Sequence, residues 1–231
     1  MKLKEKIENR DAKVGVIGLG YVGLPLALEF VRTGFHVSGI DISKTKINNL
    51  KKKKNYIQDA SDIDLIKAVE DEKLVPTNDF SVIKNLDAIS ICVPTPLNKQ
   101  KNQDISFINN VISELEKFIH PNILIILEST TYPGTTRELI LPKLESKGLT
   151  VGENFWLCFS PERIDPGNKH FGTANTPKVL GGITESCTKH GKALYETIVN
   201  KVIPVSSPES AEMVKLLENT FRAVNIGLAN E

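Results

Sequence analysis

The 231-residue sequence has few cysteines, little net charge and no long apolar run. Its three cysteines are an odd number without the spacing of a metal site, which argues against a disulfide scaffold and indicates reduced thiols in the cytoplasm. A formal net charge of +1 gives no electrostatic basis for binding nucleic acid. No apolar run is long enough to span a bilayer, and the first ten residues lack the core of a signal peptide. We therefore expect neither a nucleic-acid nor a membrane partner.

Histidine is also scarce, and its positions do not suggest a metal site. His36, His120, His170 and His190 are scattered without the spacing of metal ligands, so we predict no metal. Hydrophobic residues make up 40% of the sequence, as in an ordinary globular protein. A chain of this length can form one large domain, or one domain and part of another.

The most informative stretch is glycine-rich. An apolar run, Val14–Ile17, is followed by Gly18, Gly20 and Gly23 in the spacing G-x-G-x-x-G, and then by apolar residues with helical spacing. This pattern predicts a buried strand, a tight turn and a helix. In a dinucleotide-binding turn, Gly18 permits the bend, Gly20 lets the backbone approach a pyrophosphate and Gly23 allows close packing. The amino-terminal end of the helix then faces the phosphates.

An acidic residue follows the second predicted strand. The strand begins at His36 and ends in Asp41, about 20 residues beyond the glycines. A carboxylate there can accept hydrogen bonds from the adenosine ribose and would repel a 2′-phosphate, so we predict NAD rather than NADP. Arg32 and Lys44 are the only cations that we expect nearby, and neither is at the strand end. The alternative is a turn without phosphate, with Asp41 as an ordinary acid before a helix.

Apolar runs of strand length alternate with helical patterns along the rest of the chain. Ser43 and Ser61 cap two predicted helices, and the second runs to about Glu72 and is ended by Pro76. The alternation predicts an α/β fold with a doubly wound, Rossmann-like and mostly parallel sheet. Ligands bind beyond the carboxyl ends of such strands. Later predicted strands are Ala88–Val93, Ile123–Leu127, Phe155–Phe159, Val179–Gly182 and Lys201–Val205.

The last predicted element is a helix that starts at Ser207-Pro208 and continues to Glu231. Its apolar residues cover more than one face, so it needs partners on several sides. We predict an NAD-binding domain over residues 1–206, and residues 207–231 as the start of a long helix that is cut short. We also expect a homodimer through this helix. The apolar residues are Met213, Val214, Leu216, Leu217, Phe221, Val224, Ile226 and Leu228.

Five motifs in this order resemble the UDP-glucose/GDP-mannose dehydrogenase family, from about Lys13 to the end of the sequence. Within the family, Ser160–Gly167 is similar to the branch that oxidises UDP-N-acetylhexosamines, notably the UDP-N-acetylglucosamine 6-dehydrogenases. Members that act on UDP-glucose usually carry a second glutamate where this sequence has Pro166. The motifs are Gly18–Pro25, Cys92–Pro96, Glu128–Thr130 with Pro133–Thr136, Ser160–Glu162, and Lys215 with Asn219.

The resemblance implies oxidation of the sugar C6 alcohol to a carboxylate, a four-electron reaction that uses two NAD in succession. It implies that Thr130 positions the hydrolytic water, and that Glu162 holds or deprotonates it. Lys215 and Asn219, one helical turn apart, would stabilise an alkoxide and an oxyanion. It also implies a UDP-sugar substrate and cofactor contacts by Gly18, Gly20, Tyr21, Val22, Gly23, Asp41, Val93, Pro94, Thr95, Ser129 and Thr130.

Without the resemblance, these four catalytic candidates have ordinary structural interpretations. Lys215 and Asn219 would be surface residues of a helix, and Thr130 would be a helix cap. Glu162 would form a salt bridge with Arg163 in a loop. Sequence alone leaves these alternatives open.

The family's covalent cysteine lies in a glycine-rich loop downstream of the asparagine and has no counterpart here. Cys92 and Cys158 fall in predicted buried strands, and Cys187 begins a helix away from the strand ends. The resemblance therefore implies the NAD-binding portion of a longer enzyme whose carboxy-terminal UDP-binding domain is absent. Two other interpretations remain: a hydroxyacid dehydrogenase of similar architecture, and an NAD-binding module that acts alone.

Overall fold

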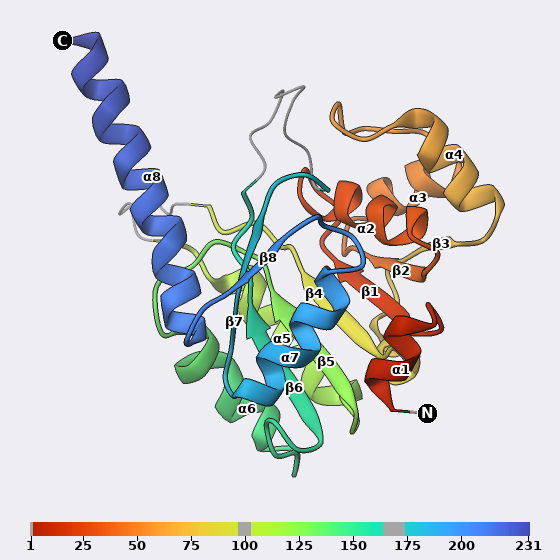
Figure 1. Cartoon of the computed structure of the whole chain (residues 1–231). Helices are drawn as coiled ribbons and strands as arrows, with labels where there is room; N and C mark the ends of the chain where they lie inside the picture. The colour runs from red at the N-terminus through yellow and green to blue at the C-terminus, as the bar shows by residue number, and fades with distance from the viewer. Residues whose placement is uncertain (1, 97–102, 164–173) are drawn as a thin grey trace.

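The computed structural model describes residues 2–96, 103–163 and 174–231. Its strands form one sheet with helices packed on both faces (Figure 1). The order across the sheet is β3-β2-β1-β4-β5-β6-β7-β8. The strands are β1 Lys13–Ile17, β2 His36–Ile40, β3 Leu74–Thr77, β4 Ala88–Ile91, β5 Ile123–Leu127, β6 Phe155–Phe159, β7 Lys178–Gly182 and β8 Val202–Pro204.

Two clusters of buried apolar side chains cover the two faces of the sheet, one with α1, α2, α3, α4 and α7, the other with η1, α5 and α6. The strands between them are apolar on both faces, as expected for a doubly wound sheet. The predicted Rossmann-like α/β fold is confirmed. The helices are α1 Leu3–Glu8, α2 Gly23–Arg32, α3 Lys44–Lys51, α4 Asp62–Glu70, the 3-10 helix η1 Phe80–Asn85, α5 Ser106–Phe118, the π-helix η2 Thr135–Ile140, α6 Leu141–Glu145, α7 Glu185–Tyr195 and α8 Pro208–Asn230.

The sheet is parallel from β3 to β6, but β7 runs antiparallel to β6 and β8 is parallel to β7. Cys158 pairs with Gly182, and Phe159 with Gly181. A parallel pair needs a crossover connection, usually a helix, whereas an antiparallel pair does not. The described residues between β6 and β7 contain no helix, which fits the reversal of direction.

The interpretation of Pro76 as a helix stop was wrong. Helix α4 ends at Glu70, and Glu72 has the positive φ of a turn residue, 54°. Pro76 then lies inside β3, in register with Gly39 of β2. Because β3 is at the edge of the sheet, the missing N–H of a proline is tolerated there.

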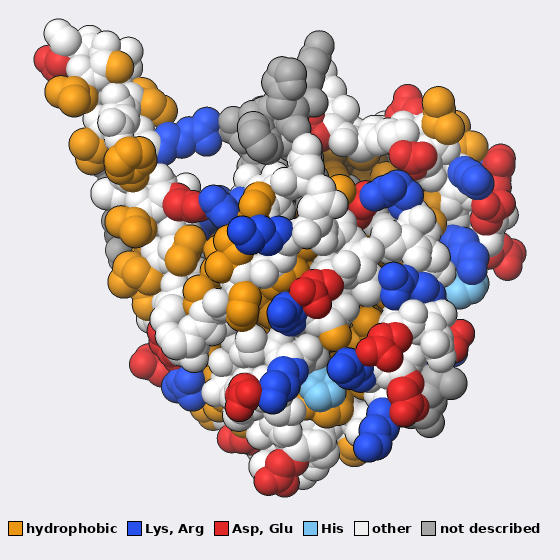
Figure 2. Space-filling model, viewed as in Figure 1, with side chains coloured by type: hydrophobic (Ala, Val, Ile, Leu, Met, Phe, Trp, Pro, Cys, Tyr) orange, Lys and Arg blue, Asp and Glu red, His pale blue; other side chains and the backbone are white. Residues whose placement is uncertain are grey.

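Helix α8 projects away from the body of the protein (Figure 1). Only its first turns are packed, with Pro208, Ala211 and Glu212 buried. Apolar side chains line its projecting part (Figure 2), and Phe221 is 70% exposed. The predicted helix is confirmed, while its partner remains a prediction. None of the described helices is both long and apolar enough to cross a membrane.

Candidate functional site

A cavity of about 1030 Å³ lies beyond the carboxyl ends of β1, β4 and β5. Strand β1 has β2 on one side and β4 on the other, so the order of the strands along the chain reverses at this point. Open α/β sheets bind their ligands at such a switch point. The cavity is lined from the glycine turn and Asp41 at one end to Thr130 and Glu162 at the other.

The glycine turn has the geometry of a phosphate site. Gly18 has a φ of +93°, which favours glycine, and a Cβ on Gly23 would lie 1.8 Å from the carbonyl oxygen of Gly18. A Cβ on Gly20 would meet no atom within 4 Å, and Gly20 lines the cavity. Helix α2 begins at Gly23 without a side-chain cap. The turn therefore offers an open backbone surface and a helix N-terminus to an anionic ligand.

Asp41 is buried at the end of β2 and holds the glycine turn. Its Oδ2 accepts a hydrogen bond from the N–H of Leu19 at 2.9 Å, and its Oδ1 accepts one from the N–H of Ser43 at 2.8 Å. The ammonium of Lys46 also contacts Oδ2, at 2.9 Å. Both Asp41 and Lys46 line the cavity.

The expected cations near Asp41 were the wrong ones. Arg32 pairs with Glu29 on α2, and Lys46 rather than Lys44 reaches the carboxylate. The signal was present in the sequence, because Ser43 caps α3 and fixes its first turn, which brings Lys46 back over the strand end. A second missed residue is Tyr56, whose hydroxyl donates to the carbonyl of Leu19 at 2.8 Å. Burial and then the charge of Asp41 raise the pKa of Tyr56, so it stays protonated and can donate.

The other end of the cavity is formed by loops that follow β4, β5 and β6. The cavity is lined by four predicted site residues from these loops, Thr95, Ser129, Thr130 and Glu162. Four further predicted cofactor contacts also line it, namely Tyr21, Val22, Val93 and Pro94. Gly23 does not line the cavity, because it packs beneath the glycine turn. The structure thus brings these residues to one cavity, although the individual roles remain predictions.

Cys92 was expected inside a buried strand, but β4 ends at Ile91 and Cys92 lines the cavity. It is buried, with an exposed fraction of 8%. Burial raises the pKa of its thiol, so the nucleophilic thiolate is disfavoured. Its place in the lining of the cavity therefore does not make it a substitute for the covalent cysteine that the family resemblance implies.

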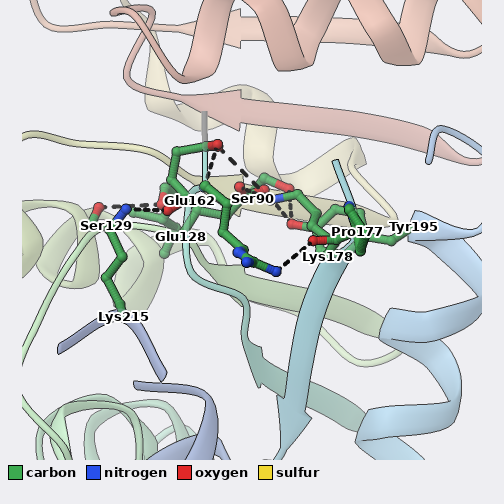
Figure 3. A network of polar contacts seen from close by, with 10 residues as sticks. Ser90, Glu128, Ser129, Glu162, Pro177, Lys178, Tyr195 and Lys215 are labelled. Carbon is green, nitrogen blue, oxygen red and sulfur yellow. Dashed lines mark hydrogen bonds and ion pairs between the residues drawn. The ribbon is translucent and has the colours of Figure 1, made fainter. Parts of the chain in front are cut away.

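A buried ionic network lies beneath the Glu162 end of the cavity (Figure 3). The carboxylate of Glu128 accepts hydrogen bonds from the ammonium of Lys178 and from the hydroxyl of Tyr195. The same ammonium is 4.0 Å from Oε2 of Glu162. Sequence reasoning missed Lys178 and Tyr195. The signal for Lys178 was an ionisable residue directly before an apolar strand, and the signal for Tyr195 was a hydroxyl on the apolar face of a helix.

The charges in this network are fixed by burial and pairing. Burial raises the pKa of Glu128, and the neighbouring ammonium acts against this effect. Burial lowers the pKa of Lys178, but Glu128 and Glu162 raise it more, so the net direction is upward and the lysine stays protonated. The Lys178 cation is therefore held between Glu128 and Glu162, both of which line the cavity.

Helix α8 meets the site through Lys215, whose ammonium donates to the backbone carbonyl of Glu162 at 2.5 Å. Burial lowers the pKa of Lys215. Neither Lys215 nor Asn219 is among the residues that line the cavity, and Asn219, one turn further, is exposed. The structural alternative for Glu162 was wrong, because the guanidinium of Arg163 pairs with Glu218, at 2.5 Å, rather than with Glu162. Pro166 and His170 lie outside the described residues.

Comparisons with known proteins agree with this geometry. The UDP-glucose/GDP-mannose dehydrogenase family, NAD binding domain, matches residues 12–199. A UDP-N-acetyl-D-mannosamine dehydrogenase of Pyrococcus horikoshii is 34% identical over 220 residues, which are 95% of this chain and 52% of the relative. A UDP-N-acetyl-D-glucosamine 6-dehydrogenase of Pseudomonas aeruginosa is 35% identical over 224 residues, which are 96% of this chain and 52% of the relative.

A solved structure gives the same result. The UDP-N-acetyl-mannosamine dehydrogenase Cap5O of Staphylococcus aureus superimposes with a TM-score of 0.87 at 34% identity, over 95% of this chain and 53% of that one. The chain thus spans about half the length of the relatives that it matches. NAD is confirmed as the cofactor of this domain.

Proposed function

Because the chain belongs to the UDP-glucose/GDP-mannose dehydrogenase family, we propose that it provides the NAD-binding part of a UDP-N-acetylhexosamine 6-dehydrogenase. The proposed reaction oxidises the C6 alcohol of the sugar to the uronic acid with two NAD, and UDP-N-acetylglucosamine is the proposed substrate. One observation carries this proposal: a single cavity joins the glycine turn and Asp41 to Thr130 and Glu162. Binding and chemistry would then share one continuous site.

The residues at the Asp41 end suit the binding of NAD. The open face of Gly20 and the uncapped start of α2 can receive the pyrophosphate, and Asp41 can receive the adenosine ribose. Val93, Pro94 and Thr95 would then lie along the nicotinamide half. NAD supplies the hydride acceptor, while the protein orients it and excludes water.

At the other end, Thr130 and Glu162 would place and hold the hydrolytic water. Lys215 is fixed against the loop of Glu162 and carries a charge that can stabilise an oxyanion. Asn219 would join it from the next turn of α8. The covalent cysteine would come from another part of a longer protein, because Cys158 is also buried with a raised pKa and Cys187 lies buried in α7.

A second candidate is an NAD-binding module that acts alone, favoured by the cavity being formed within this chain. The hydroxyacid-dehydrogenase interpretation is set aside because of the family match. In the dehydrogenase proposal, surface-polysaccharide synthesis would use the product, and the exposed face of α8 would form the homodimer interface. Light scattering tests that interface, and a monomer at high concentration would contradict it.

Two proteins test this function: the 231-residue chain itself, and the protein that the natural gene encodes. We expect the 231-residue chain to bind NAD by calorimetry but to form no reduced cofactor with UDP-N-acetylglucosamine. In this proposal, the covalent thiol and the UDP contacts that anchor the sugar would come from outside these residues. Steady formation of reduced cofactor would show that the active site is complete within these residues. Assays of the protein encoded by the natural gene with UDP-N-acetylglucosamine, UDP-N-acetylmannosamine and UDP-glucose then identify the sugar.

A further inference from the structure

A buried carboxylate on α8 is bound to the turn that follows the Thr130 loop. Glu212 is fully buried. Its Oε2 accepts a hydrogen bond from the N–H of Gly134 at 2.6 Å, and its Oε1 accepts two from Thr136, from the N–H at 2.9 Å and from Oγ1 at 2.7 Å. The carboxylate therefore joins two parts of the chain that are more than 70 residues apart.

This carboxylate occupies the place of a helix cap. The π-helix η2 starts after Gly134, whose φ is +100°, and no side chain of its own segment caps it. A helix N-terminus leaves N–H groups without partners and favours a negative charge. Glu212 satisfies both requirements from a distant helix. Burial raises the pKa of Glu212 and its three donors act against this effect, so the carboxylate depends on this turn.

The Gly134–Thr136 turn is also connected to the candidate site. Thr131 follows Thr130 directly, and its Oγ1 is 2.6 Å from the Oγ1 of Thr135 in η2. On the other side of the contact, Lys215 lies three residues after Glu212 and so shares its side of α8. The ammonium of Lys215 reaches the carbonyl of Glu162 (Figure 3).

A nearby ion pair provides a natural comparison. Glu209, three residues before Glu212, contacts Arg137 at 2.6 Å, but both side chains are substantially exposed. Exposed ion pairs contribute little to fixing a structure. The buried carboxylate, with two backbone donors and one hydroxyl, is the stronger constraint on the rotation of α8 about its axis.

We propose that Glu212 is a positioning residue, which fixes α8 against the Gly134–Thr136 turn and thereby holds Lys215 against the backbone carbonyl of Glu162, a residue that lines the cavity. The proposal rests on the proposed function, since that function gives Lys215 its role. It adds a residue that touches neither cofactor nor sugar but determines where a reacting group stands. A purely structural contact would stabilise α8 without affecting Lys215.

The test compares Glu212→Gln with the control Glu209→Gln in the 231-residue chain. The glutamine places a donor where Gly134 or Thr136 also donates. We expect amide exchange at these two positions to become about tenfold faster or more in Glu212→Gln. Lysine amines labelled with ¹³C-methyl groups give separate NMR signals, and Lys215→Arg identifies that of Lys215. We expect this signal to move in Glu212→Gln and to stay in place in Glu209→Gln.

Thr136→Val is a milder variant that removes only the hydroxyl donor, and it should move the Lys215 signal in the same direction by less. It decides the question if Glu212→Gln does not fold. An unmoved Lys215 signal in both variants, with faster exchange at Gly134, would overturn the proposal and leave Glu212 as a cap only. Failure of the unsubstituted chain to bind NAD would contradict the proposed function, and the Lys215 signal would still decide the role of Glu212.

Discussion

The two ends of the cavity are constructed in different ways. At the Asp41 end, a short continuous stretch supplies backbone geometry: a glycine turn, a helix start and one carboxylate. At the Glu162 end, the side chain that follows β5 meets side chains from β7 and α7 in a buried network, and a lysine of α8 contacts the backbone of Glu162. The first end depends on the shape of the main chain, and the second depends on paired charges. The two ends should therefore respond differently to substitution.

The largest effect is expected from Lys178→Met, which leaves the carboxylate of Glu128 buried without its cation. Removing one partner of a buried ion pair costs about 3–5 kcal/mol of the free energy of unfolding. Denaturant unfolding measures the loss. The control is Lys6→Met, since Lys6 pairs with Asp87 at 2.6 Å where the lysine is 35% exposed, and we expect a loss of about 1 kcal/mol or less. Equal losses would contradict the view that a buried, paired charge supports the Glu162 end of the cavity.

The next largest effect is expected from Gly23→Ala in the glycine turn. Its Cβ would overlap the carbonyl oxygen of Gly18, which is backbone and cannot turn aside. Overpacking of this kind costs about 1–3 kcal/mol of stability, and NAD binding should be lost with the distorted turn. Gly20→Ala is the matched variant, because its Cβ has open space. We expect it to keep the stability of the parent in unfolding experiments and to weaken NAD in calorimetry. If Gly20→Ala unfolds more easily than Gly23→Ala, the assignment of the two glycines is wrong.

Asp41→Ala should weaken NAD by about 1–3 kcal/mol, because the ribose loses charge-assisted hydrogen bonds. The same variant should narrow the preference for NAD over NADP. Lys46→Met should have a smaller effect, since this lysine is partly exposed. Arg32→Met is the control and should leave both affinities unchanged. Calorimetry with the two cofactors measures these values, and equal affinity of the parent for both would contradict the role of Asp41.

The smallest effect concerns a group outside both ends. His190 stacks on Trp156, with ring centroids 3.9 Å apart, and its Nδ1 lies 2.8 Å from the carbonyl of Ser186. Burial lowers the pKa of His190, so the unfolded chain binds more protons than the folded chain between the lowered value and the usual one of about 6.5. The free energy of unfolding should therefore fall as the pH drops below about 6.5. Its slope against pH should correspond to a difference of less than about one bound proton between the unfolded and folded chains. In His190→Phe this slope should disappear from unfolding curves measured across that range.

The Asp41 end could be predicted from sequence because its signals are local. Glycine spacing, an apolar strand and an acid lie within about 25 residues, and each has a direct geometric meaning. Lys46 was missed even there, although the cap at Ser43 determines its position. Strand β3 was missed because a proline was taken as a stop, and only its edge position makes the proline acceptable.

The Glu162 end could be predicted only in part, because its contacts join distant segments. The motif containing Glu128 was identified by resemblance, but no local pattern pairs it with Lys178, which is 50 residues away. The antiparallel direction of β7 was not anticipated either, since an apolar strand pattern does not encode direction. Periodicity predicts which residues are buried, whereas partners follow from topology.

The reversed direction of β7 has a consequence for what a strand can contribute to a ligand site. In a parallel sheet, each strand reaches the ligand edge with its last residues, and its first residues lie at the far edge. Strand β7 enters the sheet at the ligand edge, and continuing the register of Phe159 with Gly181 brings its first residue, Lys178, opposite Glu162. One change of direction thus gives this edge a residue from the beginning of a strand. The position of the Lys178 cation beneath the cavity therefore depends on the topology of the sheet as well as on the sequence.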